Sequence, residues 1–256
     1  MLPKAYLDAF WRMELEPRVF VAMSFSSTYD ERFNRIIAPA VANASASARS
    51  ALSAYRVDAS SSGDAITTDI ISGIIHCQLF VADVSTIGRD SKTGAGYRNG
   101  NVMYEVGIAV ACRQPHEILL IHDDSDRLLF DVTTIPHLKI DFTEEDRARD
   151  QLSSAVKQRL AEQNHLRDAR VERAIRSLSF DELSSVRFFL QCWPRQGFGF
   201  DIKQQGINSP LLTGVSRLVD KQVLRCCGQN PSGDAMFEWT QLGAHLAERI
   251  RAGSFR

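Results

Sequence analysis

The chain has 256 residues, of which 44% are hydrophobic and 24% are charged, and its formal net charge is −1. These values exclude a disordered or collagen-like chain and leave room for one large domain or two smaller ones. The longest apolar runs are far too short to cross a bilayer, and five cysteines without a C-x-x-C spacing indicate neither a disulfide framework nor structural zinc. We therefore expect a cytoplasmic protein with no membrane partner and no metal.

Residues 18–164 show short apolar runs that alternate with segments of helical spacing. A helix is expected before them, over 3–16, so that residues 1–17 form a separate N-terminal helix. The expected strands lie at 19–23, 54–57, 79–82, 118–121 and 138–140. The expected helices lie at 30–43, 66–75, 102–112 and 144–164. Because the strands are continuous apolar runs, this order predicts an α/β fold with a doubly wound, parallel, five-stranded sheet.

Residues 165–256 show a different order of elements. Helices are expected at 170–178, 180–193 and 210–222, strands at 223–227 and 236–239, and a final helix at 240–250. This succession predicts a small winged-helix-like α+β module. DNA binding is not favoured, because the helix at 210–222 offers only Arg217 and Lys221 to phosphates. The aromatic residues Trp193, Phe198 and Phe200 favour a homo-oligomer or a protein partner instead.

Two carboxylates are the candidate working groups. Asp83 ends a predicted buried strand and Glu105 lies in the first turn of the next helix, where the helix dipole favours an ionised carboxylate. Ligands of doubly wound sheets bind outside the carboxyl ends of the strands, so both groups are expected to face one crevice. A carboxylate there can stabilise or attack the cation that develops at C1′ of a ribosyl group, as in glycoside hydrolysis. A capping aspartate and a stabilising first-turn glutamate account for the same residues about equally well.

Five segments, at 20–25, 55–58, 69–74, 80–85 and 101–109, resemble in order the nucleoside 2-deoxyribosyltransferase-like superfamily. More narrowly, they resemble its TIR-like predicted nucleotide-binding branch. The resemblance implies a flavodoxin-like sheet and a glutamate at C1′, which maps to Glu105, with Asp83 as the strand-end aspartate. It also implies substrate contacts from Met23, Ser24, Phe25, Arg56, Asp58, Asp69, Ser85, Asn101 and Tyr104.

The function implied by the resemblance is cleavage or transfer at the N-glycosidic bond of a nucleotide, nucleoside or NAD, with no cofactor required. TIR-like domains with an appended module resemble prokaryotic immune effectors. The alternatives are a non-catalytic nucleotide sensor coupled to a winged-helix output module, and a transcription regulator. Residues 87–100 are inserted just before the glutamate segment, as a lid, a phosphate-contacting loop or a disordered excursion, and this insertion leaves the substrate open.

Overall fold

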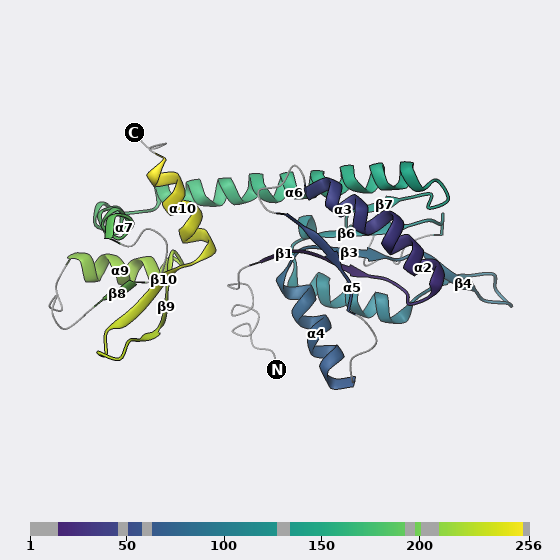
Figure 1. Cartoon of the computed structure of the whole chain (residues 1–256), viewed down its shortest axis with the longest axis horizontal. Helices are drawn as coiled ribbons and strands as arrows, with labels where there is room; N and C mark the ends of the chain where they lie inside the picture. The colour runs from purple at the N-terminus through teal and green to yellow at the C-terminus, as the bar shows by residue number, and fades with distance from the viewer. Residues whose placement is uncertain are drawn as a thin grey trace. The chain divides into compact units, whose positions relative to one another are not determined.

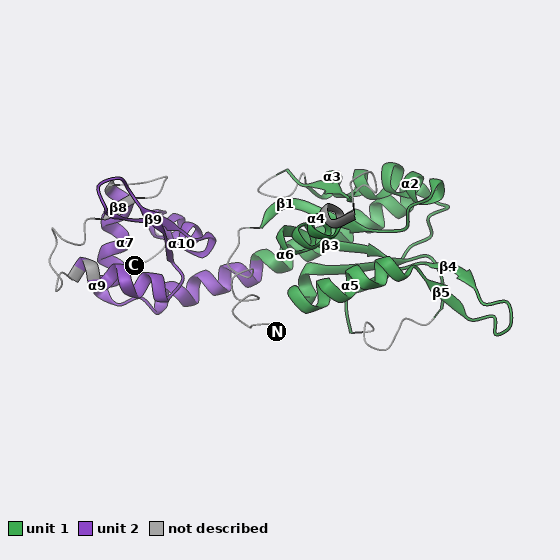
Figure 2. Cartoon of the chain, turned by 90° about the horizontal axis from the view of Figure 1, so that it is seen from below, with its two compact units in different colours: residues 1–164 green, residues 165–256 purple. Residues whose placement is uncertain are grey.

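In the computed structural model, the described residues are 15–45, 51–57, 63–126, 134–192, 198–200 and 210–252. The chain divides into two compact units, 1–164 and 165–256 (Figure 2). The expected N-terminal helix lies almost wholly outside the described residues, and Glu16 already belongs to the first strand. No helix in the described part of the chain combines the length and the apolar character needed to cross a membrane.

A five-stranded parallel sheet forms the centre of the N-terminal unit (Figure 1). Its strands run in the order β2-β1-β3-β6-β7, and each neighbouring pair is parallel. This is the order of a flavodoxin-like doubly wound sheet, so the predicted fold class is confirmed. The strands are β1 (Glu16–Ala22), β2 (Ser53–Tyr55), β3 (Cys77–Asp83), β6 (Ile118–His122) and β7 (His137–Lys139).

Helices cover both faces of this sheet and bury a separate apolar cluster on each (Figure 1). On one face, Leu79 and Val81 of β3 pack with residues of α3 (Ala38–Ser45) and α6 (Glu145–Arg176). On the other face, the neighbouring residues Phe80 and Ala82 pack with α4 (Gly63–His76) and α5 (Gly100–Cys112). A strand that is buried on both sides needs apolar residues at every position, which explains the continuous apolar runs.

The helix expected over 30–43 has an irregular centre. It consists of α2 (Ser27–Arg32), a π-helical turn η1 (Phe33–Ile37) and α3. The backbone N–H of Ala38 donates to the carbonyl oxygen of Phe33, which is the i→i+5 bond of a π-helix. Ile36 and Ile37 of this turn are buried in the apolar cluster on the sheet face that α3 and α6 cover.

The long helix α6 differs from the prediction. The expected end at residue 164 and the expected separate helix at 170–178 are wrong, because one helix runs from Glu145 to Arg176. No glycine or proline interrupts this segment. The helix therefore has no reason to stop where its first apolar stripe ends, near residue 164. Its first half supplies Leu152 and Val156 to the core of the N-terminal unit, and its last turns supply Val171 and Ile175 to the core of the C-terminal unit.

The C-terminal unit combines helices with a three-stranded antiparallel sheet of order β8-β10-β9. Strand β8 was not expected from the sequence. The winged-helix likeness of this unit stays a prediction. Its elements are α7 (Phe180–Cys192), β8 (Phe198–Phe200), α9 (Pro210–Asp220), β9 (Leu224–Gln229), β10 (Ala235–Trp239) and α10 (Gln241–Arg251).

Candidate active site

The sheet order defines where a ligand of the N-terminal unit would bind. Strand β1 lies between β2 and β3, so the chain changes direction across the sheet at the β1–β3 pair. Ligands of doubly wound sheets occupy the crevice at such a switch point, outside the carboxyl ends of the strands. Ser24 follows β1 and Asp83 ends β3, and the structure therefore brings both of these predicted site residues to the switch-point edge.

Glu105 is a half-buried carboxylate in α5. The side of α5 that packs on the sheet carries Val102, Val106 and Ala109, and helical spacing places Glu105 on the flank of this stripe. Within the described residues, no hydrogen bond or ion pair reaches its carboxylate, and burial raises the pKa of Glu105 to about 7. A group with this pKa is divided between its acid and carboxylate forms at neutral pH, which suits acid–base or nucleophilic work.

The position of Glu105 along its helix differs from the prediction. Helix α5 begins at Gly100, two residues earlier than expected, so Glu105 lies in the second turn. The favourable effect of the helix dipole falls off within the first turn, so it contributes little to the charge of Glu105. The Cα–Cβ bond of Glu105 tilts toward the N-terminus of α5, as it does for every helical residue.

Asn99 was not predicted as a site residue, although an asparagine before the first turn is a common start signal. Its Oδ1 accepts from the backbone N–H groups of Asn101, at 2.9 Å, and Val102, at 3.3 Å, and so caps α5. Its Nδ2 donates to Oγ of Ser24 at 3.2 Å. One side chain therefore joins the helix that carries Glu105 to the loop after β1.

Asp83 is almost fully buried, with 3% of its surface exposed. Its carboxylate accepts from the Ser85 hydroxyl at 2.5 Å, from the Ser85 backbone N–H at 3.1 Å and from the Arg32 guanidinium at 3.1 Å. Burial raises the pKa of Asp83, and the contacts with Ser85 and Arg32 act in the opposite direction. Arg32 also binds Asp123 after β6, and its guanidinium lies 4.8 Å from the ring centroid of Tyr29 and 4.3 Å from that of Phe142.

The two predicted carboxylates, Asp83 and Glu105, lie on opposite faces of the sheet. Asp83 continues the alternation of Leu79 and Val81, and its partner Arg32 belongs to α2, whose Tyr29 packs on the same cluster. Glu105 belongs to α5, on the opposite face. The structure therefore places Asp83 and Ser85 in a buried hydrogen-bonded cluster with Arg32. The catalytic role of Asp83 beside Glu105 stays a prediction.

Breaking the buried pair at Arg32 should destabilise the N-terminal unit. Arg32→Met leaves the Asp83 carboxylate buried without its cation, so we expect a loss of about 3 kcal/mol in the free energy of unfolding, measured by urea denaturation. Arg35→Met is the matched control, because the side chains of Arg35 and Glu145 are 62% and 43% exposed, and we expect no measurable change in the free energy of unfolding. Equal losses in the two variants would contradict the anchoring role of Arg32.

Phe25 and Arg56 come together at the ends of β1 and β2. The Arg56 guanidinium lies 5.5 Å from the ring centroid of Phe25 and 5.1 Å from that of Phe33. It also pairs with Asp30 at 2.5 Å. Phe25 is 54% exposed, so the cluster offers solvent an aromatic ring that a cation holds in place.

The remaining predicted contacts are spread over different surroundings. Met23 is 4% exposed and packs in the core, while Tyr104 is 63% exposed. Asn101 and Asp69 are exposed on α5 and α4. Asp58 lies outside the described residues.

The inserted segment at 87–100 is ordered in the structure and forms most of an antiparallel hairpin, β4 (Thr86–Arg89) and β5 (Gly96–Arg98). The hairpin projects from the end of the sheet in both views (Figures 1 and 2). It is bound at its base to the loop after β6, where Thr86 N–H donates to Asp124 at 2.8 Å and Arg89 pairs with Asp126 at 2.8 Å. Burial acts to raise the pKa of Asp124, but hydrogen bonds from Thr86 and Arg98 lower it to about 2.

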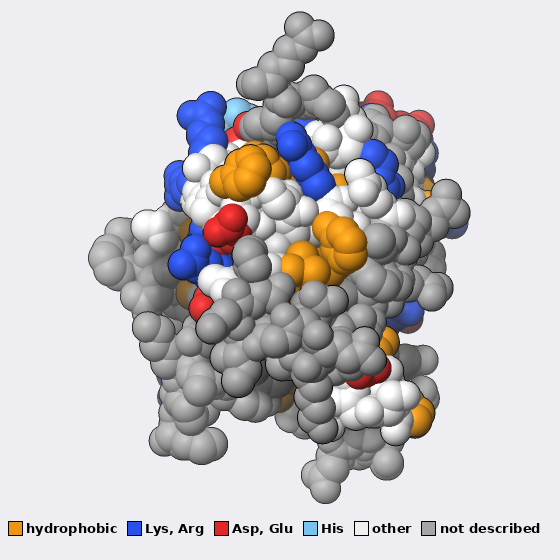
Figure 3. All heavy atoms as spheres, turned by 90° about the vertical axis from the view of Figure 1, so that its left-hand side faces the viewer, with side chains coloured by type: hydrophobic (Ala, Val, Ile, Leu, Met, Phe, Trp, Pro, Cys, Tyr) orange, Lys and Arg blue, Asp and Glu red, His pale blue; other side chains and the backbone are white. Residues whose placement is uncertain are grey.

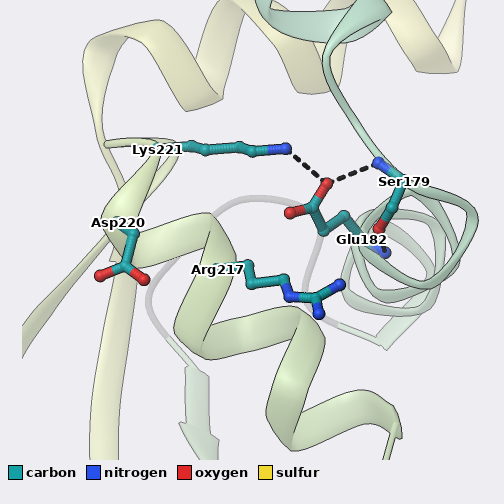
Figure 4. A pocket seen from close by; sticks show the side chains of 5 residues that line it. All are labelled: Ser179, Glu182, Arg217, Asp220 and Lys221. Atoms are coloured by element: carbon teal, nitrogen blue, oxygen red, sulfur yellow. Dashed lines mark hydrogen bonds and ion pairs between the residues drawn. The ribbon is translucent and has the colours of Figure 1, made fainter.

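Within the described ranges, no group of three or more His, Cys, Asp or Glu side chains is arranged to hold a metal ion. The C-terminal unit has a cavity of about 370 Å³ lined by Ser179, Glu182, Arg217, Asp220 and Lys221 (Figure 4). Lys221 donates to Glu182 at 2.7 Å and to the Ser177 carbonyl at 2.6 Å. Of the two cations considered for DNA, Lys221 is therefore already engaged within the protein.

No family model matches the chain, and no curated protein matches it. A solved structure with some likeness to it is the CMP N-glycosidase BcmB of Clostridium botulinum, at 17% sequence identity and a TM-score of 0.34. The match covers 53% of this chain and 96% of that chain. A likeness at this level does not indicate what the chain acts on.

Proposed function

We propose that the N-terminal unit acts on the N-glycosidic bond of a nucleotide, nucleoside or NAD, with Glu105 working at C1′. The observation that carries this proposal is the state of Glu105. Burying an ionisable group without a partner costs free energy, and such groups are retained mainly where the chemistry of a site uses them. Glu105 is half-buried, has a raised pKa and lies in the second turn of α5, a helix that covers one face of a doubly wound sheet.

The proposed reaction has two steps. As the C1′–N bond breaks, its electron pair leaves with the base, and positive charge develops at C1′. The base of a nucleoside or nucleotide takes up a proton as it leaves, whereas nicotinamide leaves NAD as a neutral molecule without one. The Glu105 carboxylate stabilises that charge or bonds to C1′. Water then attacks C1′, loses a proton and gives the free sugar, and Glu105 is released unchanged. In a transferase a second base replaces water.

Neighbouring groups at the same edge support a nucleotide ligand. The exposed Phe25 ring is suited to stacking on a base, since every base has an aromatic face. Arg56 holds this ring in place and is itself paired with Asp30, so the ring is the feature that favours a nucleotide here. The narrower proposal of NAD as substrate, and of a regulated prokaryotic immune effector, rests on the TIR-like resemblance of the sequence alone.

The test is to incubate the purified chain with ribonucleosides, deoxyribonucleosides, their monophosphates and NAD, and to identify the products by mass spectrometry. We expect a free base together with the matching sugar or sugar phosphate, or free nicotinamide from NAD. A panel that stays intact while one member binds would favour the alternative of a non-catalytic sensor. Binding of that member should then survive Glu105→Gln.

We propose that the C-terminal unit forms a protein contact, with a second copy of the chain as the first candidate. On helix α7, Phe180 is 82% exposed and Phe188 is 41% exposed. Figure 3 shows hydrophobic side chains in small groups separated by Lys and Arg side chains on the face of the molecule that it presents. Light scattering of the intact chain measures the oligomeric state directly.

A further inference from the structure

Arg98, the last residue of the hairpin, is bound to two loops at the switch-point edge. Its guanidinium donates to the carbonyl oxygen of Val84, after β3. It also pairs with Asp124 at 3.2 Å and donates to the Asp126 carbonyl at 3.2 Å, both after β6. The side chains of Arg98 and Asp124 are 9% and 11% exposed, so this is a buried pair with several hydrogen bonds rather than a surface contact.

The hairpin backbone is fitted to this junction. Thr86 on the partner strand also donates to Asp124, so both strands are held by one carboxylate. At Gly96, an added Cβ would come too close to the Asp126 carboxylate and the Thr86 methyl group, so these side chains would have to shift to admit a larger residue. The base of the hairpin is therefore fixed to the sheet, and this argues against a lid that opens at this base.

Asn99 is the next residue after Arg98 and is fixed at both ends. Its Oδ1 caps the first turn of α5, and its Nδ2 reaches Ser24 after β1. Two consecutive residues thus tie the start of α5 to the loops after β1, β3 and β6. Glu105 lies six residues farther along the same helix, about 9 Å along its axis at 1.5 Å per residue. A helix is stiff over this length, so its start determines where the glutamate lies.

We propose that Arg98 and Asn99 are positioning residues that hold the start of α5 against the switch-point edge and thereby keep the Glu105 carboxylate half-buried beside the ligand crevice. In this arrangement the inserted hairpin fixes the position of α5, the helix that carries Glu105. The inference rests on the proposed function for its catalytic meaning. Its structural content is independent of any substrate.

The test is a titration of Glu105 in the full-length chain by NMR with ¹³C-labelled glutamate, in which the Glu105→Gln spectrum identifies the signal. We expect a midpoint near pH 7 in the wild type. In Arg98→Met and Asn99→Ala the midpoint should fall by about one pH unit or more, because a loosened first turn exposes the carboxyl to water. Asn99→Ser keeps a cap and should restore part of the shift.

Arg89→Met is the matched control, because it removes an arginine–aspartate pair of the same hairpin whose arginine is 57% exposed. We expect it to leave the Glu105 midpoint unchanged. If Arg98→Met does not fold, Ser24→Ala tests the same attachment of α5, since it removes only the acceptor of Asn99 Nδ2. We expect it to lower the Glu105 midpoint by a smaller amount. Variants that melt earlier while Glu105 titrates as in the wild type would overturn the inference. The readout needs no turnover, so an inactive wild type would contradict the proposed function and leave this result standing.

Discussion

Glu105→Gln is expected to lower kcat/KM for N-glycosidic cleavage by about 10³-fold, because a neutral amide of the same shape neither attacks C1′ nor stabilises its developing charge. The measurement is the initial rate of base release from the substrate found in the nucleotide panel. The matched control is Glu162→Gln, on the exposed side of α6, where the glutamate is 43% exposed and pairs with Arg159. Equal turnover by the wild type and Glu105→Gln would contradict the proposed catalytic role of Glu105.

The second large effect is a dependence of the reaction on pH. The carboxylate is the reactive form, and burial raises the pKa of Glu105 to about 7. The value of kcat/KM should therefore rise about tenfold per pH unit below 7 and level off above it, a difference of about 100-fold between pH 5 and pH 8. The profile of kcat/KM is the measurement, because it reports groups of the free enzyme. A flat profile from pH 5 to pH 8 would contradict the carboxylate mechanism.

The same pKa predicts a change in stability with the opposite direction. The unfolded chain releases the Glu105 proton near the ordinary value of 4.5, whereas the folded chain keeps it up to about 7. The folded state therefore binds more protons in this window, and its stability falls as pH rises through it. Glu105→Gln lacks this loss, so we expect it to be about 1–2 kcal/mol more stable than the wild type at pH 8, after allowance for partial exposure. Urea denaturation at pH 5 and pH 8 should show a difference that grows with pH.

The sheet could be predicted from the sequence because local chemistry determines it. Each central strand is a run of apolar residues that the α3 and α5 faces bury from opposite sides, and the flanking helices show clear apolar stripes. Helix α6 could not be divided correctly, because a polar stretch without glycine or proline looks the same whether a helix ends there or continues. The hairpin was missed because each of its short strands carries a single large apolar residue, Ile87 or Tyr97.

Apart from the family resemblance, the sequence indicated candidate site residues only at the ends of expected strands and the starts of expected helices. Asp83 ends a strand and Ser24 follows one, while Glu105 was expected in the first turn of α5 and lies in its second. Arg32 and Arg98 were missed because their partners are 51 and 26 residues away in the chain, and an arginine in a polar segment gives no sign of burial. Asn99 had a local signal as a cap, but its bond to Ser24 spans 75 residues. Contacts of this range depend on the folded arrangement and have no periodic pattern that would reveal them.

The π-helical turn η1 has a consequence for how this site tolerates changes in chain length. A wider turn of this kind acts as one extra residue in a helix and rotates the residues before it by about 100° relative to the residues after it. Arg32 lies just before the turn and points at Asp83, while Ile37 within the turn and Val41 after it remain in the core. Removing one residue from the turn would restore a regular helix and swing Arg32 away from the sheet edge without disturbing the packing of α3. The direction of the buried Arg32 side chain therefore depends on the number of residues in this turn. Among homologous chains, single insertions or deletions at this point would alter the contacts of Arg32 with Asp83 and Asp123 more than most substitutions do.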